Sequence, residues 1–236
     1  MILKTEGIVL RSLKHQDSNV IVTLYTAEYG IRSFIIKSYR TSRSRSRHSY
    51  FQPLSIVDIV FLHKENRNLQ KITESRLSSV LQEVQTQPIK LSMGLAMMEI
   101  VYDTVKEEEE NAPLYQFIKD CILFLDQSPR KQVNIFIYFI LHLTRFLGFL
   151  PNDESEAAQK VDFDIRRGTI QASQHNDATA HLLRRFLQTD LENCQEITFD
   201  QTNKRFLIKT IFDYYQEHIQ GFRYPQTLKV FSEVFE

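Results

Sequence analysis

The spacing of the apolar residues changes at about residue 80, and this change limits the folds that the chain can adopt. Before it, short runs rich in branched residues are separated by polar turns. In residues 19–26 the side chains of Val20, Val22 and Leu24 fall at every second position, which is the pattern of a half-buried strand. After it, apolar residues recur three and four positions apart, which is the pattern of an amphipathic helix. The chain is therefore predicted to contain a strand-rich part followed by a helical part.

Strand-like runs fill the first 80 residues. They cover residues 7–13, 19–26, 31–39, 54–63 and 68–77. Short antiparallel strands in so short a span suit a small closed barrel better than a sandwich, and the OB-fold is such a barrel. We predict an α+β protein with an OB-fold β-barrel over residues 1–80.

The remaining residues, 81–236, are predicted to form an all-α helical domain with one short irregular or β insert at about 152–176. Prolines precede the periodic runs, as expected at the first position of a helix: Pro88, Pro113, Pro129 and Pro225. The most apolar segment, residues 133–150, includes Asn134, His142, Thr144 and Arg145. A membrane span needs about 20 mostly apolar residues. We therefore interpret this segment as a buried core helix and expect no membrane association.

The charges are divided unequally between the two parts. The first 80 residues carry 13 Lys and Arg against 6 Asp and Glu, whereas the whole chain carries 29 of each. The net charge is therefore +7 before residue 80 and −7 after it. A basic N-terminal part favours a polyanionic partner, and an acidic C-terminal part does not.

Residues 38–50, SYRTSRSRSRHSY, concentrate arginines among small hydroxyl residues: Arg40, Arg43, Arg45 and Arg47. The planar guanidinium suits phosphate and stacks on bases, and the serines add hydrogen-bond donors for phosphate oxygens. Tyr39 and Tyr50 flank the arginines, and basic residues interleaved with rings are typical of single-strand binding. The simpler alternative is a solvated surface loop. We predict a nucleic-acid contact here, which is extended by three residues if they lie on the same face of the barrel: Lys37, Arg32 and Arg11.

Patterns typical of catalysis and metal binding do not occur in the sequence. The two cysteines, Cys121 and Cys194, form no CxxC pair, and the seven histidines form no HExxH motif. Glycine-rich phosphate loops and GxSxG are also missing, and the acidic run 107–110 is interpreted as a solvated helix end. We expect two buried, reduced thiols, no catalytic residues, no metal and no cofactor.

Three segments carry a resemblance to known proteins. The first is the N-terminal run EGIVLRSLKHQDSNVIVTLYTAEYGIRSFIIKSYRTSRSR, the second is the central LTRFLGFLPN, and the third is YYQEHIQGFRYPQTLKVFSEVF near the C-terminus. Together they resemble the RecO family of bacterial DNA-repair proteins. Many relatives carry a four-cysteine zinc site after the Leu-Gly turn, but the corresponding insert here contains no cysteine. No zinc is therefore expected, and packing or hydrogen bonding must hold the insert.

The resemblance implies an OB-fold barrel, a helical domain and a role without catalysis. Such proteins bind single-stranded and double-stranded DNA, anneal complementary strands, and help to load the recombinase onto strands covered by single-stranded DNA-binding protein. The partners implied are RecR and the acidic C-terminal tail of that binding protein. The location implied is the cytoplasm, in association with the nucleoid.

An acidic tail that ends in an aromatic residue would require an apolar groove with an arginine at its rim. The run HLLRRFL, residues 181–187, offers Arg184 and Arg185 beside Leu183 and Phe186. The alternative is an ordinary amphipathic helix with two solvated arginines. A different function is also open at this point: a protein-interaction adapter whose barrel and basic loop dock an acidic protein partner.

Overall fold

The structure is a computed structural model that describes residues 1–15, 19–37, 49–65, 67–129, 132–156 and 158–228. Within these ranges the chain divides into two compact units, Met1–Gln127 and Ser128–Leu228. The expected boundary near residue 80 separates strands from helices. The compact units divide the chain later, because the first two helices belong with the barrel.

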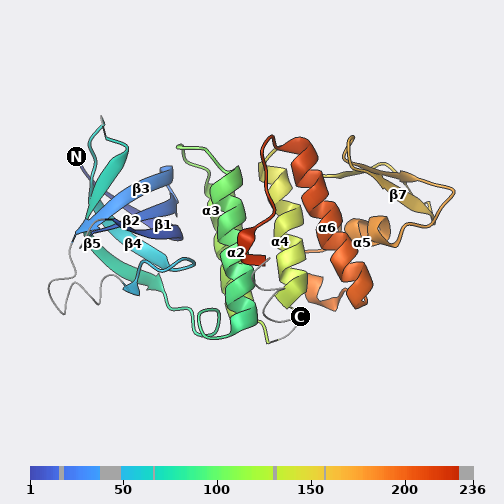
Figure 1. Cartoon of the computed structure of the whole chain (residues 1–236), viewed down its shortest axis with the longest axis horizontal. Helices are drawn as coiled ribbons and strands as arrows, with labels where there is room; N and C mark the ends of the chain where they lie inside the picture. The colour runs from blue at the N-terminus through green and yellow to red at the C-terminus, as the bar shows by residue number, and fades with distance from the viewer. Residues whose placement is uncertain (16–18, 38–48, 66, 130–131, 157, 229–236) are drawn as a thin grey trace. The chain divides into compact units, whose positions relative to one another are not determined.

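The first unit begins with a closed barrel of five strands in the order β1-β2-β3-β5-β4 (Figure 1). The strands are β1 (Ile2–His15), β2 (Asn19–Thr26), β3 (Gly30–Lys37), β4 (Ile56–Leu62) and β5 (Leu69–Ser79). Strand β3 pairs in parallel with β5, and the other barrel pairings are antiparallel. This order and closure confirm the predicted OB-fold barrel. Strand β1 begins earlier than expected because residues 2–6 pair with β4.

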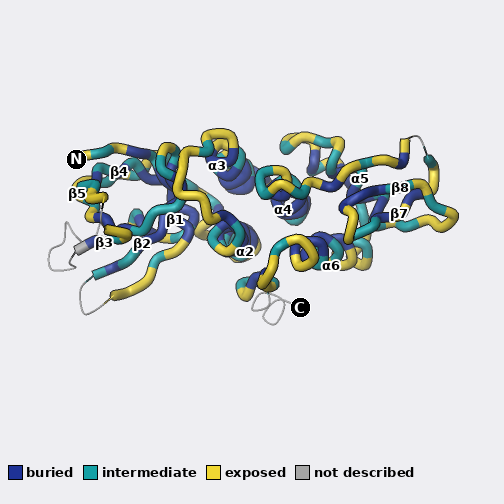
Figure 2. Tube along the Cα trace, turned by 90° about the horizontal axis from the view of Figure 1, so that it is seen from above, coloured by how far each residue is buried: buried dark blue, intermediate teal, exposed yellow. Residues whose placement is uncertain are grey.

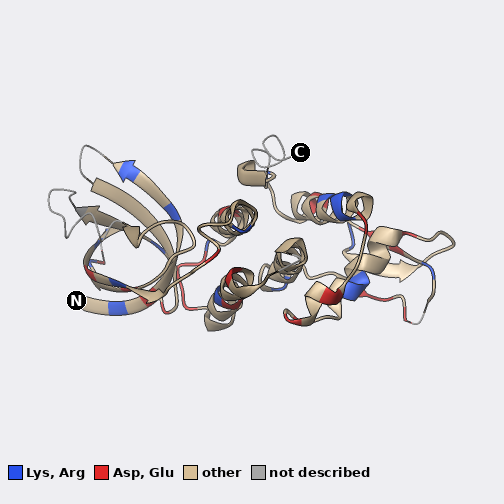
Figure 3. Cartoon of the chain, turned by 90° about the horizontal axis from the view of Figure 1, so that it is seen from below, with Lys and Arg blue, Asp and Glu red and all other residues tan. Residues whose placement is uncertain are grey.

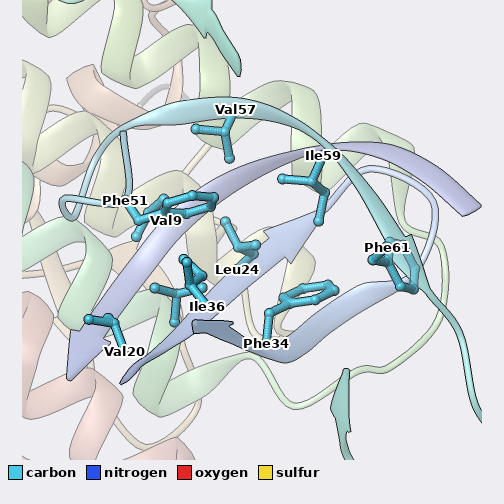
Figure 4. Packing of buried hydrophobic residues seen from close by; sticks show 10 residues of the cluster. Val9, Val20, Leu24, Phe34, Ile36, Phe51, Val57, Ile59 and Phe61 are labelled. Atoms are coloured by element: carbon cyan, nitrogen blue, oxygen red, sulfur yellow. The ribbon is translucent and has the colours of Figure 1, made fainter. Parts of the chain in front are cut away.

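Side chains from alternate strand positions fill the interior of the barrel (Figure 4). The residues predicted to face inward on β2, Val20, Val22 and Leu24, are at most 4% exposed. The rings of Phe34 and Phe61 meet edge to face, with centroids 5.1 Å apart. The whole cluster consists of Val9, Val20, Val22, Leu24, Phe34, Ile36, Phe51, Val57, Ile59 and Phe61.

Two helices, α2 (Pro88–Thr104) and α3 (Ala112–Gln127), complete the first unit. Pro88 occupies the first turn of α2, as the sequence predicts. One carboxylate fixes the residues that connect β5 to α2: Asp126 of α3 accepts backbone N–H groups from Gln82, Glu83 and Val84 at 2.7–3.0 Å.

A buried lysine completes this connection. The side chain of Lys90 is fully buried, and its Nζ donates to the carbonyl of Asp126 at 2.7 Å and forms an ion pair with Glu83. A buried ammonium requires such partners, because its desolvation is otherwise very unfavourable. The connecting segment is therefore tied to both α2 and α3.

The second unit is organised around α4 (Gln132–Phe146), which lies against α5 (Ala178–Leu187), the 3₁₀ helix η1 (Asn193–Glu196) and α6 (Gln201–His218). Most residues of helix α4 are buried, and Figure 2 shows this helix nearly end-on with buried residues in dark blue. The buried Asn134 amide donates to the carbonyls of Cys194 and Ile197, both at 2.8 Å, so its polar group is satisfied. The interpretation of this segment as a buried core helix is confirmed. Among the described helices, none is long and apolar enough to cross a membrane.

The insert of the second unit forms a small sheet in the order β6-β8-β7. Its strands are β6 (Asn152–Asp153), β7 (Val161–Asp164) and β8 (Thr169–Ala172). The expected short β insert is therefore present. Apolar packing holds one side of the sheet, where Phe163 contacts Tyr214 of α6 with ring centroids 5.3 Å apart.

An arginine holds the other part of the insert. Arg184 of α5 places its Nε 3.1 Å from Asp153 Oδ2, and its Nη1 donates to the carbonyl of Ala158 at 3.1 Å. It also donates to the hydroxyl of Ser155. These contacts join Asp153, Ser155 and Ala158 of the insert to α5. They explain how an insert without cysteines keeps its conformation.

Candidate nucleic-acid interface

A surface groove follows the loop between β4 and β5. It has a volume of about 640 Å³ and is lined by Ile35, Leu62, Lys64, Arg67, Asn68, Leu69, Gln70 and Lys71. The three cations, Lys64, Arg67 and Lys71, are exposed, and among the residues that the structure describes no acidic side chain lines the groove. None of the ion pairs within the described ranges uses these cations. We refer to this feature as the cationic groove.

The loop that carries the cationic groove is held by one buried amide. Gln70 is 5% exposed, accepts the N–H of Lys64 at 2.9 Å, and donates to the carbonyls of Lys64 (3.0 Å) and Arg67. The N–H of Arg67 also donates to the carbonyl of Lys64 at 3.1 Å. Hydrogen bonds therefore hold the backbone at Lys64 and Arg67, which reduces the entropy lost when their side chains bind a ligand.

A second, smaller groove lies on another side of the same loop. It has a volume of about 470 Å³ and is lined by Met1, His63, Lys64, Glu65 and Arg67. The N-terminal ammonium of Met1 donates to the carbonyl of His63 at 3.2 Å. Lys64 and Arg67 line both grooves, but the carboxylate of Glu65 also lines the second, so the second groove is less positive than the cationic groove.

The wall formed by β1, β4 and β5 has the opposite character. A groove of about 620 Å³ lies here, and its cations are Lys4 and Arg76. The same groove is lined by four carboxylates: Glu6, Glu28, Asp58 and Glu74. Figure 3 shows both signs of charge on the barrel. The two grooves therefore differ in the sign of their side-chain charge, and the positive potential of the barrel lies at the cationic groove rather than at this wall.

Glu6 in the acidic wall is held in its charged form. Burial alone would raise its pKa, but hydrogen bonds from Lys119, Ser78 and Tyr115, together with the charge of Lys119, outweigh this effect and lower the pKa below the ordinary value of 4.5. The Lys119 Nζ and the Tyr115 hydroxyl lie 2.7 and 2.8 Å from Glu6 Oε2. This carboxylate therefore joins the barrel to α3.

The predicted arginine segment lies outside the described residues. This applies to Tyr39, Arg40, Arg43, Arg45 and Arg47, for which the DNA contact stays a prediction. The chain enters this segment at Lys37, where β3 ends. Two residues earlier, Ile35 pairs with Lys71 of the cationic groove. The segment is therefore connected directly to a strand that lines the groove.

Three other predicted residues, Tyr50, Arg11 and Arg32, have partners within the first unit. Tyr50 is half-buried and packs against the barrel core, which leaves less of its ring for stacking on a base. The guanidinium of Arg11 lies over the ring of Tyr102 in α2, 5.4 Å from its centroid. Arg11 is exposed, but it faces a helix that also carries Asp103.

Arg32 is bound by the acidic run between α2 and α3. Its Nη1 lies 2.6 Å from Glu108 Oε2, and its Nη2 donates to the Glu108 carbonyl at 2.9 Å. The N–H of Ile31 donates to the carbonyl of Glu107 at 3.0 Å. The run 107–110, which the sequence suggests is a solvated helix end, therefore docks on the turn between β2 and β3. Because Glu108 binds the guanidinium of Arg32, Arg32 does not extend the cationic groove.

This docking requires a glycine. Gly30 has φ of +59°, and a Cβ at this position would lie 2.4 Å from the carbonyl oxygen of Glu107. A side chain at this position would be strained by the positive φ and would displace the acidic run 107–110 from the turn between β2 and β3.

Of the two arginines proposed for tail binding, Arg184 is engaged inside the insert. Its guanidinium contacts Asp153, Ser155 and Ala158, so it is not a free rim cation. Arg185 is exposed and forms no ion pair within the described part of the chain. The geometry therefore supports a structural role for Arg184, and tail binding by Arg185 stays a prediction.

Known proteins match the whole of this architecture. The sequence profile described as Recombination protein O N terminal matches residues 1–80, and the profile described as Recombination protein O C terminal matches residues 85–227. The chain belongs to the RecO family of DNA repair proteins. It is 32% identical to DNA repair protein RecO of Christiangramia forsetii, 30% to that of Flavobacterium johnsoniae and 29% to that of Bacteroides fragilis. Each comparison covers 100% of both chains.

The groups that could suggest chemistry have structural roles in this RecO family member. Cys121 and Cys194 are buried thiols, as expected, and burial raises the pKa of the Cys194 thiol to about 12. The ring of His142 stacks on Tyr138, its Nε2 lies 2.9 Å from the carbonyl of Phe186, and burial lowers its pKa. In the part of the chain that the structure describes, no group of three His, Cys, Asp or Glu side chains is placed to hold a metal ion.

The cations of the cationic groove give a weaker signal in the sequence than the dense arginine run 38–50. Lys64, Arg67 and Lys71 are spread over a turn and the start of the next strand. Their position around the predicted loop between the fourth and fifth strands was the available signal, because OB-folds bind oligonucleotides with this loop.

Proposed function

We propose that this RecO family protein binds DNA without cleaving it and promotes the pairing of complementary strands in recombinational repair. The observation that carries the proposal is the cationic groove beside the loop between β4 and β5, whose described lining includes three exposed cations and no carboxylate. The arginine segment 38–50, which follows β3, adds further positive charge next to the strand that lines this groove.

Electrostatics accounts for the annealing without bond-making chemistry. Two DNA strands repel each other through their phosphates, and cations that replace condensed counterions lower this repulsion. A cationic surface also raises the local concentration of strands. Loading of the recombinase, with RecR and the tail of single-stranded DNA-binding protein as partners, is the part of the proposal that rests on family membership.

The test removes the three cations of the groove in a K64A/R67A/K71A variant. If each contacts one phosphate of a single strand, the slope of log affinity against log salt should become less negative by about 2. Between 50 and 200 mM salt, the wild type should then lose about 20-fold more affinity than the variant does. The measurement is fluorescence anisotropy with labelled oligothymidine across this salt range.

A matched control removes three cations from the same unit but outside the groove. Lys4 and Arg76 lie on the acidic wall, and Lys106 lies over the ring of Tyr102. The K4A/R76A/K106A variant has the same net charge as the groove variant and should retain most of the wild-type slope. Equal slopes for the two variants would show that total charge, not the groove, governs binding. Full wild-type binding by the groove variant, with an acidic protein partner lost, would favour the adapter function instead.

A further inference from the structure

The turn between β7 and β8 carries two adjacent arginines on the second unit. Arg166 and Arg167 are both exposed, and neither takes part in an ion pair within the described ranges. Other cations of this unit have partners: Arg184 binds Asp153, Lys209 binds Asp213 at 2.5 Å, and Lys160 donates to the carbonyl of Gln174. The turn therefore presents two neighbouring guanidinium groups without a carboxylate partner.

The carboxylate nearest in sequence is occupied by the backbone. Asp164 Oδ1 accepts the N–H groups of Arg166 and Arg167 at 3.0 and 3.1 Å, and the carbonyl of Asp164 accepts the N–H of Gly168 at 2.8 Å. Among the ion pairs of the described residues, none joins the Asp164 carboxylate to the side chain of Arg166 or Arg167, so both guanidinium groups keep their hydrogen-bond donors available to a ligand. The other carboxylate of β7, Asp162, accepts the backbone N–H of Phe163.

The turn is also anchored to the rest of the unit. Gly168 has φ of +67°, and a Cβ there would lie 2.3 Å from the hydroxyl oxygen of Tyr214. The carbonyl of Gly168 accepts the N–H of Asn152 at 2.8 Å, and His218 Nε2 lies 3.0 Å from the carbonyl of Ile165. Arginines on a fixed backbone bind phosphate with a smaller entropic loss than arginines on a mobile loop.

We infer that Arg166 and Arg167 form a second phosphate-binding element, which holds a second DNA strand while the barrel holds the first. This inference rests on the proposed function, because annealing requires one protein molecule or assembly to contact two strands. It assigns one strand contact to each compact unit. The ligand is recognised through its backbone phosphates, so the second contact should show no base preference.

The experiment measures capture of a second strand. The protein is bound at sparse coverage to immobilised oligothymidine, and labelled oligothymidine is then added, so that base pairing cannot contribute. The R166E/R167E variant should bind the first strand within about 2-fold of the wild type, because the barrel is unchanged, and should capture the second strand about 10-fold more weakly. Loss of two phosphate contacts should also make the salt slope of second-strand capture less negative by about 1.4.

The control variant is R185E/R223E, which has the same charge change on exposed residues of the same unit. It should capture the second strand like the wild type. Equal losses in the two double variants, or undiminished capture by R166E/R167E, would overturn the inference. If R166E/R167E does not fold, R166Q/R167Q decides the question in the same assay. Failure of the wild type to bind the first strand would instead overturn the proposed function.

Discussion

The arginine that holds the insert allows a quantitative test of how this RecO family member dispenses with cysteine ligands there. The perturbation is Arg184→Ala, alone and combined with Asp153→Asn. The arginine side chain is 16% exposed and that of Asp153 is 22% exposed, so the pair lies between a surface ion pair and a fully buried one. The Nη1 of Arg184 also donates to the carbonyl of Ala158 at 3.1 Å.

The size of the effect follows from this intermediate burial. Exposed ion pairs contribute about 0–1 kcal/mol, whereas removal of one partner from a fully buried pair costs about 3–5 kcal/mol. We expect Arg184→Ala to lower the free energy of unfolding of the second unit by about 2 kcal/mol, because Asp153 and the Ala158 carbonyl lose their partner. The double-mutant cycle with Asp153→Asn should give a coupling energy of about 1 kcal/mol.

The assay is urea unfolding followed by far-UV circular dichroism, with limited proteolysis of the loop between β6 and β7 as a local readout. Arg185→Ala is the matched control, since Arg185 is the next residue and is exposed. Substitution there should change stability by less than about 0.5 kcal/mol. A loss in Arg184→Ala no larger than in Arg185→Ala, or a coupling energy near zero, would refute the assigned role.

Two further predictions concern the first unit. Gly30→Ala should destabilise it by about 1–3 kcal/mol in the same urea assay, because the new Cβ would meet the Glu107 carbonyl at a positive φ; a neutral result would contradict the docking of the acidic linker. Because the pKa of Glu6 is lowered in the folded state, its contribution to stability is present above the unfolded value of 4.5 and is lost as pH falls through the folded value. The difference in urea midpoint between wild type and Glu6→Gln should therefore shrink between pH 7 and pH 3, and a constant difference would argue against the contact with Lys119.

The barrel could be predicted because local sequence determines it directly. The alternation of Val20, Val22 and Leu24 follows from burial of one face of a strand, and the structure confirms it. Helix α4 was equally predictable, because its apolar run is too short and too polar for a membrane and must be buried. In both cases the pattern depends on residues close in the sequence.

The sequence does not predict which charged side chains form ion pairs, because these pairs join residues far apart in the chain. Arg32 meets Glu108, which is 76 positions away, and Arg184 meets Asp153, which is on another element. The sequence pattern identifies such arginines as cations but does not indicate whether each one forms an ion pair with a carboxylate in the folded protein. The groove cations are the converse case, because their sparse spacing gives a weak signal and only the folded loop brings them together.

The contacts of Lys90 and Asp126 have a practical consequence for anyone who wishes to study the barrel as a fragment. Cutting the chain after residue 80 would remove both of these residues, and it would also separate Glu6 from Lys119 and Arg32 from Glu108. Such a fragment would expose charges and apolar surface that the intact protein covers. A fragment that ends at Gln127 retains all of these pairs and is the better choice for isolating the OB-fold.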